Sequence, residues 1–258
     1  WSGLVGGDDV QMSIIGSFAD KNVGQGKAVA LAPTLTGADL GNYAVSVQAQ
    51  SSASITPRPL NIGGVAAQSK VYDGTTAATL ETGALTRTGL VAGDLVNVSF
   101  SGQFADKNAG VGKSVALSPT LQGADVGNYT ITIQPSALAD ITPRGLVVTA
   151  DDQQKTYGGA DPALTYRLGG QGLAVGDTVA GSISGQLASR TGADATAGSH
   201  VIGLGTLSVD ANYRITQFVP ATLQVDKAPL TLTFRRVLFR SPTSRPTEAS
   251  AGSRLSGK

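Results

Sequence analysis

The sequence has 258 residues with 34 glycines, and it balances 19 lysines and arginines against 18 acids for a net charge of +1. Aromatic side chains make up only 5% of residues and cysteine is absent, which excludes thiol nucleophiles, cysteine–zinc sites and iron–sulfur clusters. Because hydrophobic stabilisation scales with the apolar area removed from water, so few large side chains predict several small modules rather than one large core.

Short runs of β-branched or alternating apolar residues recur along the chain, with turn-forming residues between them. Such runs are typical of strands, and they predict strands at residues 44–47, 96–100, 130–133, 146–149 and 230–233. The Ala-rich stretch 75–85 allows a helical turn and no more. Clusters of Gly, Asn and Asp between the runs favour tight turns. The expected class is therefore all-β, built from small antiparallel modules that are either immunoglobulin-like sandwiches or β-grasp-like.

An internal repeat organises these elements. Residues 3–58 align without a gap to residues 89–144, and 34 of the 56 aligned positions are identical at an offset of 86. A divergent third copy follows, in which Asn212-Tyr213 repeats the Asn-Tyr pair of the first two copies. Prolines fall at the same step in all three copies, at Pro57, Pro143 and Pro229.

The repeat predicts the domain boundaries. We expect a repeat at 1–58, a complete repeat at 59–144, a divergent repeat at 145–229 and the start of a further repeat at 230–234. The first of these lacks the counterpart of 59–88, so the sequence is expected to begin inside a repeat. Each of the first two copies ends in Ile-Thr-Pro-Arg. Proline fixes its own φ and keeps the preceding residue extended, so we expect short, stiff connections and modules arranged end to end.

Residues 235–258 differ in pattern and composition from the rest of the chain. They hold six of the 19 basic residues but only one acid, Glu248. The run at 235–241 resembles the conceptual translation of a common short-read sequencing adapter, and we interpret 235–258 as a non-native tail. Acids outnumber bases in the remaining residues, so no nucleic-acid footprint is expected. No apolar run approaches the roughly 18 residues that would span a membrane.

Several motifs in fixed order resemble a known family. Val71-Tyr72-Asp73-Gly74, followed by Gly-Leu-x-x-Gly-Asp and Gly-Asn-Tyr, is similar to the YDG repeat of large bacterial adhesins. Lys155-Thr156-Tyr157-Gly158 in the third copy looks like the related MBG repeat. Both repeats are typical of filamentous-haemagglutinin-like exoproteins. The resemblance implies secretion, an extracellular location at the bacterial cell surface and an adhesin context, and it carries over no catalytic residue.

The candidate sites are few. Asp20, Asp39, Asp106 and Asp125 recur in turns, where loop oxygens suit calcium, although Asp also stabilises turns without any metal. Tyr43, Tyr129 and Tyr213 could stack on sugars, but their place after Asn at a strand start favours a core tyrosine bonded to nearby backbone, as in a tyrosine corner. The single histidine, His200, sits where a strand is expected to begin and lacks the partners of a catalytic or zinc site. No cofactor is expected.

These observations predict a structural repeat segment, a stalk or spacer of a secreted bacterial surface adhesin, without enzymatic activity. Its expected partners are the neighbouring repeats of the same chain. The alternative is a weak adhesive module that binds host or matrix glycans or proteins, with repetition supplying avidity. An enzyme would need a convergent acid, base, nucleophile or metal set. The adjacent acids Asp8-Asp9 do not recur as a pair in the second copy, where Leu95 replaces Asp9.

Overall fold

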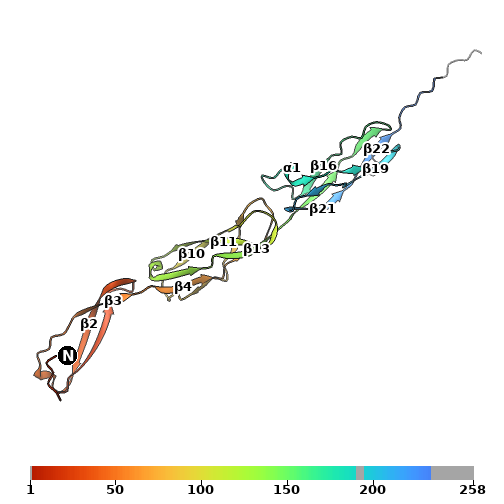
Figure 1. Ribbon diagram of the computed structural model, residues 1–258. Coiled ribbons are helices and arrows are strands. Elements are labelled where there is room, and N and C mark those ends of the chain that lie inside the picture. Colours follow the sequence, from red (N-terminus) through yellow and green to blue (C-terminus); the bar gives the residue numbers. More distant parts are fainter. Residues whose placement is uncertain (1, 190–194, 234–258) are drawn as a thin grey trace, which may run out of the picture.

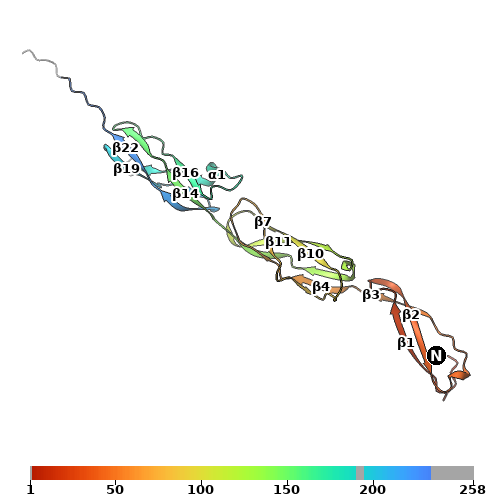
Figure 2. The same ribbon diagram turned by 180° about the vertical axis from the view of Figure 1, so that it is seen from behind.

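The computed structural model describes residues 2–189 and 195–233. Three β modules follow one another along an extended rod (Figure 1), and the view from behind shows the same order without folding back (Figure 2). The connections between modules are short. One strand ends at Ile55 and the next begins at Arg58, and a second pair is separated only by Pro143. The expected end-to-end arrangement is confirmed, and the proline connections explain it because one or two extended residues leave little freedom to bend.

The first module is a single antiparallel sheet with the strand order β1-β2-β3. Its elements are β1 (Gln11–Phe18), β2 (Gly24–Thr36), the 3-10 turn η1 (Leu40–Asn42) and β3 (Gln50–Ile55). None of residues 2–57 is buried. The sheet therefore lacks a second layer on its apolar face.

The second module has two facing sheets, ordered β6-β13-β11-β10-β7 and β12-β4-β9, and a small β5–β8 pair. Its elements are β4 (Arg58–Gly63), β5 (Ala66–Ala67), β6 (Lys70–Val71), β7 (Ala77–Ala78), β8 (Leu80–Glu81), β9 (Thr86–Thr88), β10 (Asn97–Phe104), β11 (Gly110–Gln122), the 3-10 turn η2 (Val126–Asn128), β12 (Tyr129–Ile133) and β13 (Ser136–Thr142). Leu60 and Ile62 of β4 are buried between the layers, against Val98 and Phe100 of β10. This sheet-on-sheet packing corresponds to the sandwich alternative.

The third module repeats this plan with altered edges, in the sheets β16-β14-β21, β15-β22-β19-β18 and β17-β20. Its elements are β14 (Arg144–Ala150), β15 (Gln153–Thr156), β16 (Tyr166–Gly170), α1 (Val179–Ser182), β17 (Ile183–Ser184), β18 (Ala188–Ser189), β19 (Gly198–Gly203), β20 (Ser208–Val209), β21 (Tyr213–Val219) and β22 (Ala221–Asp226). Val148, Ile202, Leu223 and Val225 form its buried centre. His200 lies within β19, as expected, and its ring nitrogen Nε2 is 2.6 Å from the carbonyl oxygen of Thr196.

The all-β class is confirmed, but three finer expectations are wrong. The sheets of three or more strands in the second and third modules are mixed rather than antiparallel, because β4 pairs with β12, β6 with β13, β14 with β21 and β15 with β22 in parallel. Residues 44–47 and 230–233 form no strand. Both segments lack a partner within the described residues, since their counterparts β12 and β14 depend on parallel neighbours. The Ala-rich stretch 75–85 contains the short strands β7 and β8 rather than a helical turn.

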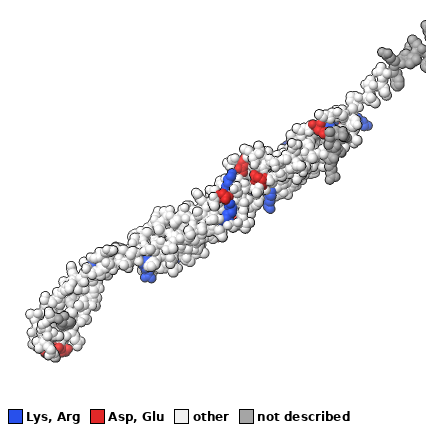
Figure 3. Space-filling view, in the orientation of Figure 1, with Lys and Arg blue, Asp and Glu red and all other residues white. Residues whose placement is uncertain are grey.

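In the described part of the chain, no helix is long and apolar enough to cross a membrane. The predicted tail at 235–258 lies outside the described residues, as does Phe234. Charged side chains are sparse on the face that Figure 3 shows, and residues of both signs gather over the junction of the second and third modules. Ion pairs of Lys107 and Lys21 cross this junction and its counterpart one repeat earlier, respectively.

Candidate functional site: the joints between modules

Each module carries one tyrosine in the same hydrogen-bonded arrangement. The hydroxyl of Tyr43 accepts from the backbone N–H of Val5 at 3.0 Å and donates to a carboxylate oxygen of Asp8 at 2.6 Å. Tyr129 repeats both bonds with Val91 and Asp94, and Tyr213 repeats them with Ala174 and Asp177. The predicted bond from nearby backbone is confirmed for all three tyrosines, and Tyr129 and Tyr213 are also buried, whereas Tyr43 is partly exposed. The aspartate partner was missed, although it ends every copy of Gly-Leu-x-x-Gly-Asp.

A second aspartate completes this node in the first two modules. Oδ2 of Asp39 accepts from the backbone N–H of Asp9 at 2.9 Å, and Oδ2 of Asp125 accepts from that of Leu95 at 2.8 Å. Hydrogen bonds from backbone N–H groups to a carboxylate are charge-assisted and strong. We call the set of Tyr129, Asp94, Asp125 and Asn128, with its counterparts in the other modules, the acceptor node.

The repeated Asp-Lys-Asn sequence forms a loop at the opposite end of each of the first two modules. Asp106 accepts from the backbone N–H of Asn108 at 2.8 Å, which closes a local Asx turn. Its other partner is Lys113, at 2.7 Å. Asp20 makes the same contacts with Asn22 and Lys27. This loop presents the lysine and asparagine that follow the aspartate to the next module.

At the first joint this loop docks on the acceptor node of the second module. The ammonium of Lys21 lies between the carboxylates of Asp94 and Asp125, 2.8 Å from the latter. The backbone N–H of Val23 donates to the side-chain oxygen of Asn128 at 3.0 Å, and the amide nitrogen of Asn128 donates back to Asn22 at 3.2 Å. Three charged groups and two side-chain amides therefore fix the orientation of the modules.

The second joint repeats these contacts one repeat later. Lys107 lies 3.2 Å from Asp177. The backbone N–H of Ala109 donates to the side-chain oxygen of Asn212 at 2.8 Å, and Asn212 donates to Asn108 at 3.2 Å. Both joints thus use the same residue types at the same positions of the repeat.

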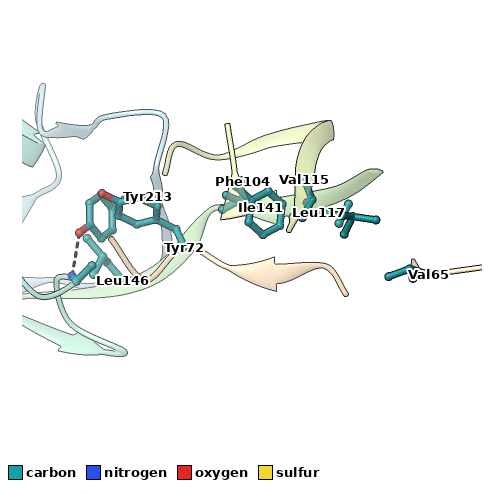
Figure 4. Packing of buried hydrophobic residues seen from close by; sticks show 10 residues of the cluster. Val65, Tyr72, Phe104, Val115, Leu117, Ile141, Leu146 and Tyr213 are labelled. Carbon is teal, nitrogen blue, oxygen red and sulfur yellow. Dashed lines mark hydrogen bonds between the residues drawn. The ribbon is translucent and has the colours of Figure 1, made fainter. Parts of the chain in front are cut away.

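The second joint also buries apolar surface. Tyr72 and Tyr213 meet edge to face with their ring centroids 5.4 Å apart, and Tyr72 is only 1% exposed. Figure 4 shows Tyr213 and Leu146 of the third module beside Tyr72, in one cluster with Phe104 and Ile141 of the second. A core that is continuous across a joint resists bending, because bending would expose its apolar area to water.

The Tyr-Asp-Gly triplet at 72–74 contributes to the second joint. The hydroxyl of Tyr72 donates to Oδ2 of Asp177 at 2.8 Å, the oxygen that Tyr213 also uses. Gly74 has φ +81, and a Cβ at this position would lie 3.0 Å from the carbonyl oxygen of Val175 in the third module. Asp73 binds Lys70 at 2.8 Å and so holds the turn. Within the triplet, Tyr72 therefore bonds to the third module, Asp73 holds the turn, and Gly74 allows the backbone of the third module to approach closely.

Hydrogen bonds and neighbouring charges shift the pKa values of the residues in the acceptor nodes. Tyr213, then Tyr72, donate to Asp177 and hold the pKa of that carboxyl below its usual value of 3.8. Lys21 lowers the pKa of both Asp94 and Asp125, and these two carboxylates raise the pKa of Lys21. Burial, then Asp177, raises the pKa of Tyr213 to about 12. At neutral pH, the aspartates of the acceptor node are therefore ionised, its tyrosine is neutral and the lysine bound to it is charged.

Acid should therefore loosen both joints. A carboxylate with a lowered pKa contributes stability that is present above its ordinary value of 3.8 and is lost as pH falls through the lowered value. We expect the distance distribution between spin labels placed on the second and third modules to stay narrow at neutral pH and to broaden only below pH 3.8. Broadening at about pH 6.5, where histidine titrates, would contradict an aspartate-held joint.

The four calcium candidates do not form one site. Asp20 and Asp106 lie in the loops, where lysines neutralise them, while Asp39 and Asp125 belong to acceptor nodes. Across residues 2–189 and 195–233, no three His, Asp or Glu side chains form a group that could hold a metal ion. Calcium binding stays a prediction to be tested with a chelator.

Comparison with known proteins agrees with the repeat structure. The family model of the YDG domain matches residues 1–53 and 56–137, and that of the MBG domain (YGX type) matches residues 146–224. No curated protein and no solved structure matches the chain. The YDG match covers the first two modules, whose Asp-Lys-Asn loops recur at an offset of 86 residues. The chain therefore belongs to the YDG domain family, and an MBG domain of the YGX type follows its YDG repeats.

Proposed function

We propose that this chain is a stalk segment of a secreted bacterial surface adhesin, that it has no catalytic activity, and that its role is to hold a binding region away from the cell. The observation that carries the proposal is the repeated joint. An Asp-Lys-Asn loop docks on an acceptor node at both junctions, with the same partners at the same repeat positions. A shared set of docking contacts fixes each module against its neighbour at both joints, which is what an extended spacer requires.

The short connections and the buried second joint support a stiff spacer over a flexible string of beads. Linkers of one or two residues between strands leave little chain to bend, and Tyr72 and Tyr213 are buried where the modules meet. The secreted, extracellular setting is proposed on the family resemblance, since YDG and MBG repeats are typical of large exoproteins.

The adhesive alternative has less support from the exposed side chains. Sugar-binding surfaces stack aromatic rings on the ligand, and among residues 2–189 and 195–233 only Tyr157 is an exposed aromatic residue. The tyrosines that recur, Tyr43, Tyr129 and Tyr213, use their hydroxyls within the acceptor nodes. A spacer needs no such surface, so the stalk is the function we favour.

Small-angle X-ray scattering of the full chain tests this proposal. A compact globule of this length should have a radius of gyration of about 18 Å. Three modules in line, each stepping roughly 40 Å as a 13-residue strand does, should give about 35 Å. A value near 35 Å that EDTA leaves unchanged supports a metal-free stalk. Shortening in EDTA would instead show that calcium at the Asp turns stiffens it, and a compact value would contradict the stalk.

A further inference from the structure

The first module presents an open groove of ≈ 430 Å³ whose lining side chains are mostly apolar. Met12 and Ile14 of β1 line it from one side, and Val45 and Val47 line it from the other. These four side chains are 38 to 50% exposed, an unusual state for residues that alternate toward one face of a sheet.

The second module shows what occupies this face. At the 86-residue offset, the four positions are Val98, Phe100, Ile131 and Ile133, and all four pack against a buried cluster. The centre of that cluster is Leu60 and Ile62 of β4, which are 0% and 3% exposed. Strand β4 runs parallel to β12 from Tyr129 opposite Arg58 to Ile133 opposite Ile62. By its counterparts in the second module, the groove of the first module therefore has the lining and the backbone edge of a strand acceptor.

The acceptor node beside the groove is also open. In the second module, Asp94 and Asp125 hold Lys21 of the preceding module, and Asn128 receives the backbone N–H of Val23. Their counterparts in the first module are Asp8, Asp39 and Asn42. Within the described residues, Asp8 and Asp39 form no ion pair. Two neighbouring carboxylates without a cation are complementary in charge to a lysine-bearing loop.

Groove and node belong to one surface, since Tyr43 lines the groove and bonds to Asp8. In the second module, both features are filled by the chain that arrives from the first module. The Asp-Lys-Asn loop of the first module binds the node, and β4, which is separated from β3 by two residues, fills the apolar face. We infer that the open end of the first module is a docking site for the trailing end of another YDG repeat. Its Asp-Lys-Asn loop binds the Asp8–Asp39 node, and the strand that follows its Thr-Pro enters the groove parallel to residues 43–47. This inference deepens the proposed stalk function and rests on it for its biological role.

The test extends the full chain by one repeat. Because the repeats align without a gap, a second copy of residues 3–88 can be placed directly before Gly3, in place of residues 1–2. We expect the backbone amides of residues 44–47 to exchange with deuterium at least tenfold more slowly than in the original chain. The amides of β12 at residues 129–133 serve as the internal reference for a folded module.

Two substitutions in the inserted copy separate the groove from the node. Leu60→Asp in that copy should return the amides of 44–47 to their original exchange rate, because a charge cannot enter the apolar groove. Lys21→Met in that copy should leave those amides slow and should broaden the distance distribution between spin labels on either side of the new joint. The control is Arg87→Met in that copy, which removes an exposed positive charge on β9, and it should change neither readout.

Unchanged exchange at 44–47 in the extended chain, with residues 129–133 still protected, would overturn the inference. Equally slow exchange at residues 44–47 with and without Leu60→Asp would overturn it too, because the protection would then not come from a strand bound in the groove. Neither result depends on the shape of the original chain. Scattering from that chain decides the stalk proposal separately, so the two can fail independently.

Discussion

Replacing Asp177 with alanine should lower the free energy of unfolding of the third module by about 3 kcal/mol and make the second joint flexible. The carboxylate accepts from the hydroxyls of Tyr72 and Tyr213 and from Lys107. Hydrogen bonds to charged groups contribute about 1.5–3 kcal/mol each, and the two buried hydroxyls would lose their acceptor. Urea titration read by pulsed hydrogen exchange resolves the third module from its neighbours.

Two further variants make this prediction specific. Asp177→Asn keeps one acceptor oxygen but no charge, so we expect about half the loss. Asp152→Ala removes an exposed aspartate of the same module that accepts from the backbone N–H of Thr222, away from the joint. It should cost about 1 kcal/mol or less and leave the label distances across the joint unchanged. Similar losses for Asp152→Ala and Asp177→Ala would show that the joint adds nothing to stability.

Gly123→Ala should destabilise the second module by about 3 kcal/mol or more, because it combines backbone strain with a direct clash. Gly123 has φ +133, and a Cβ there would lie 2.0 Å from the carbonyl oxygen of Leu95. The turn that it forms places Asp125 under the N–H of Leu95 and opposite Lys21. The variant should therefore also loosen the first joint, which label distances across that joint would report.

The control is a neighbouring glycine without those constraints. A Cβ on Gly127 would meet no atom within 4 Å, so Gly127→Ala should change the unfolding free energy by no more than about 0.5 kcal/mol. Equal effects of the two substitutions would mean that η2, rather than the close approach at Gly123, sets the cost.

The residue pattern of a segment predicted a strand correctly where the neighbouring strand that pairs with it is also present. Strand β12 was expected from its β-branched residues, and it forms because β4 lies beside it. The same pattern at 44–47 forms no strand, since propensity contributes little without a hydrogen-bonded neighbour. The parallel pairings were missed for a related reason, because alternation identifies a strand but not the direction of its partner.

The candidate site was only half visible in the sequence. The recurring Asn-Tyr pair indicated a tyrosine corner, and the hydroxyl of Tyr129 does accept from Val91. The joint was missed because Lys107 and Asp177 are 70 residues apart and meet only when two modules dock. The signal was nevertheless present. Asp-Lys-Asn is kept in both YDG repeats at turn positions where other polar residues would turn the chain equally well.

The directions of the strands have a mechanical consequence. Chain enters the second module at Arg58, the start of β4, and leaves it at Thr142, the end of β13, at the other end of the module (Figure 1). A pull along the rod would therefore load the β4–β12 ladder lengthwise, so that its five residue pairs must slide together rather than open one at a time. We therefore expect the second module to unfold only at a high pulling force.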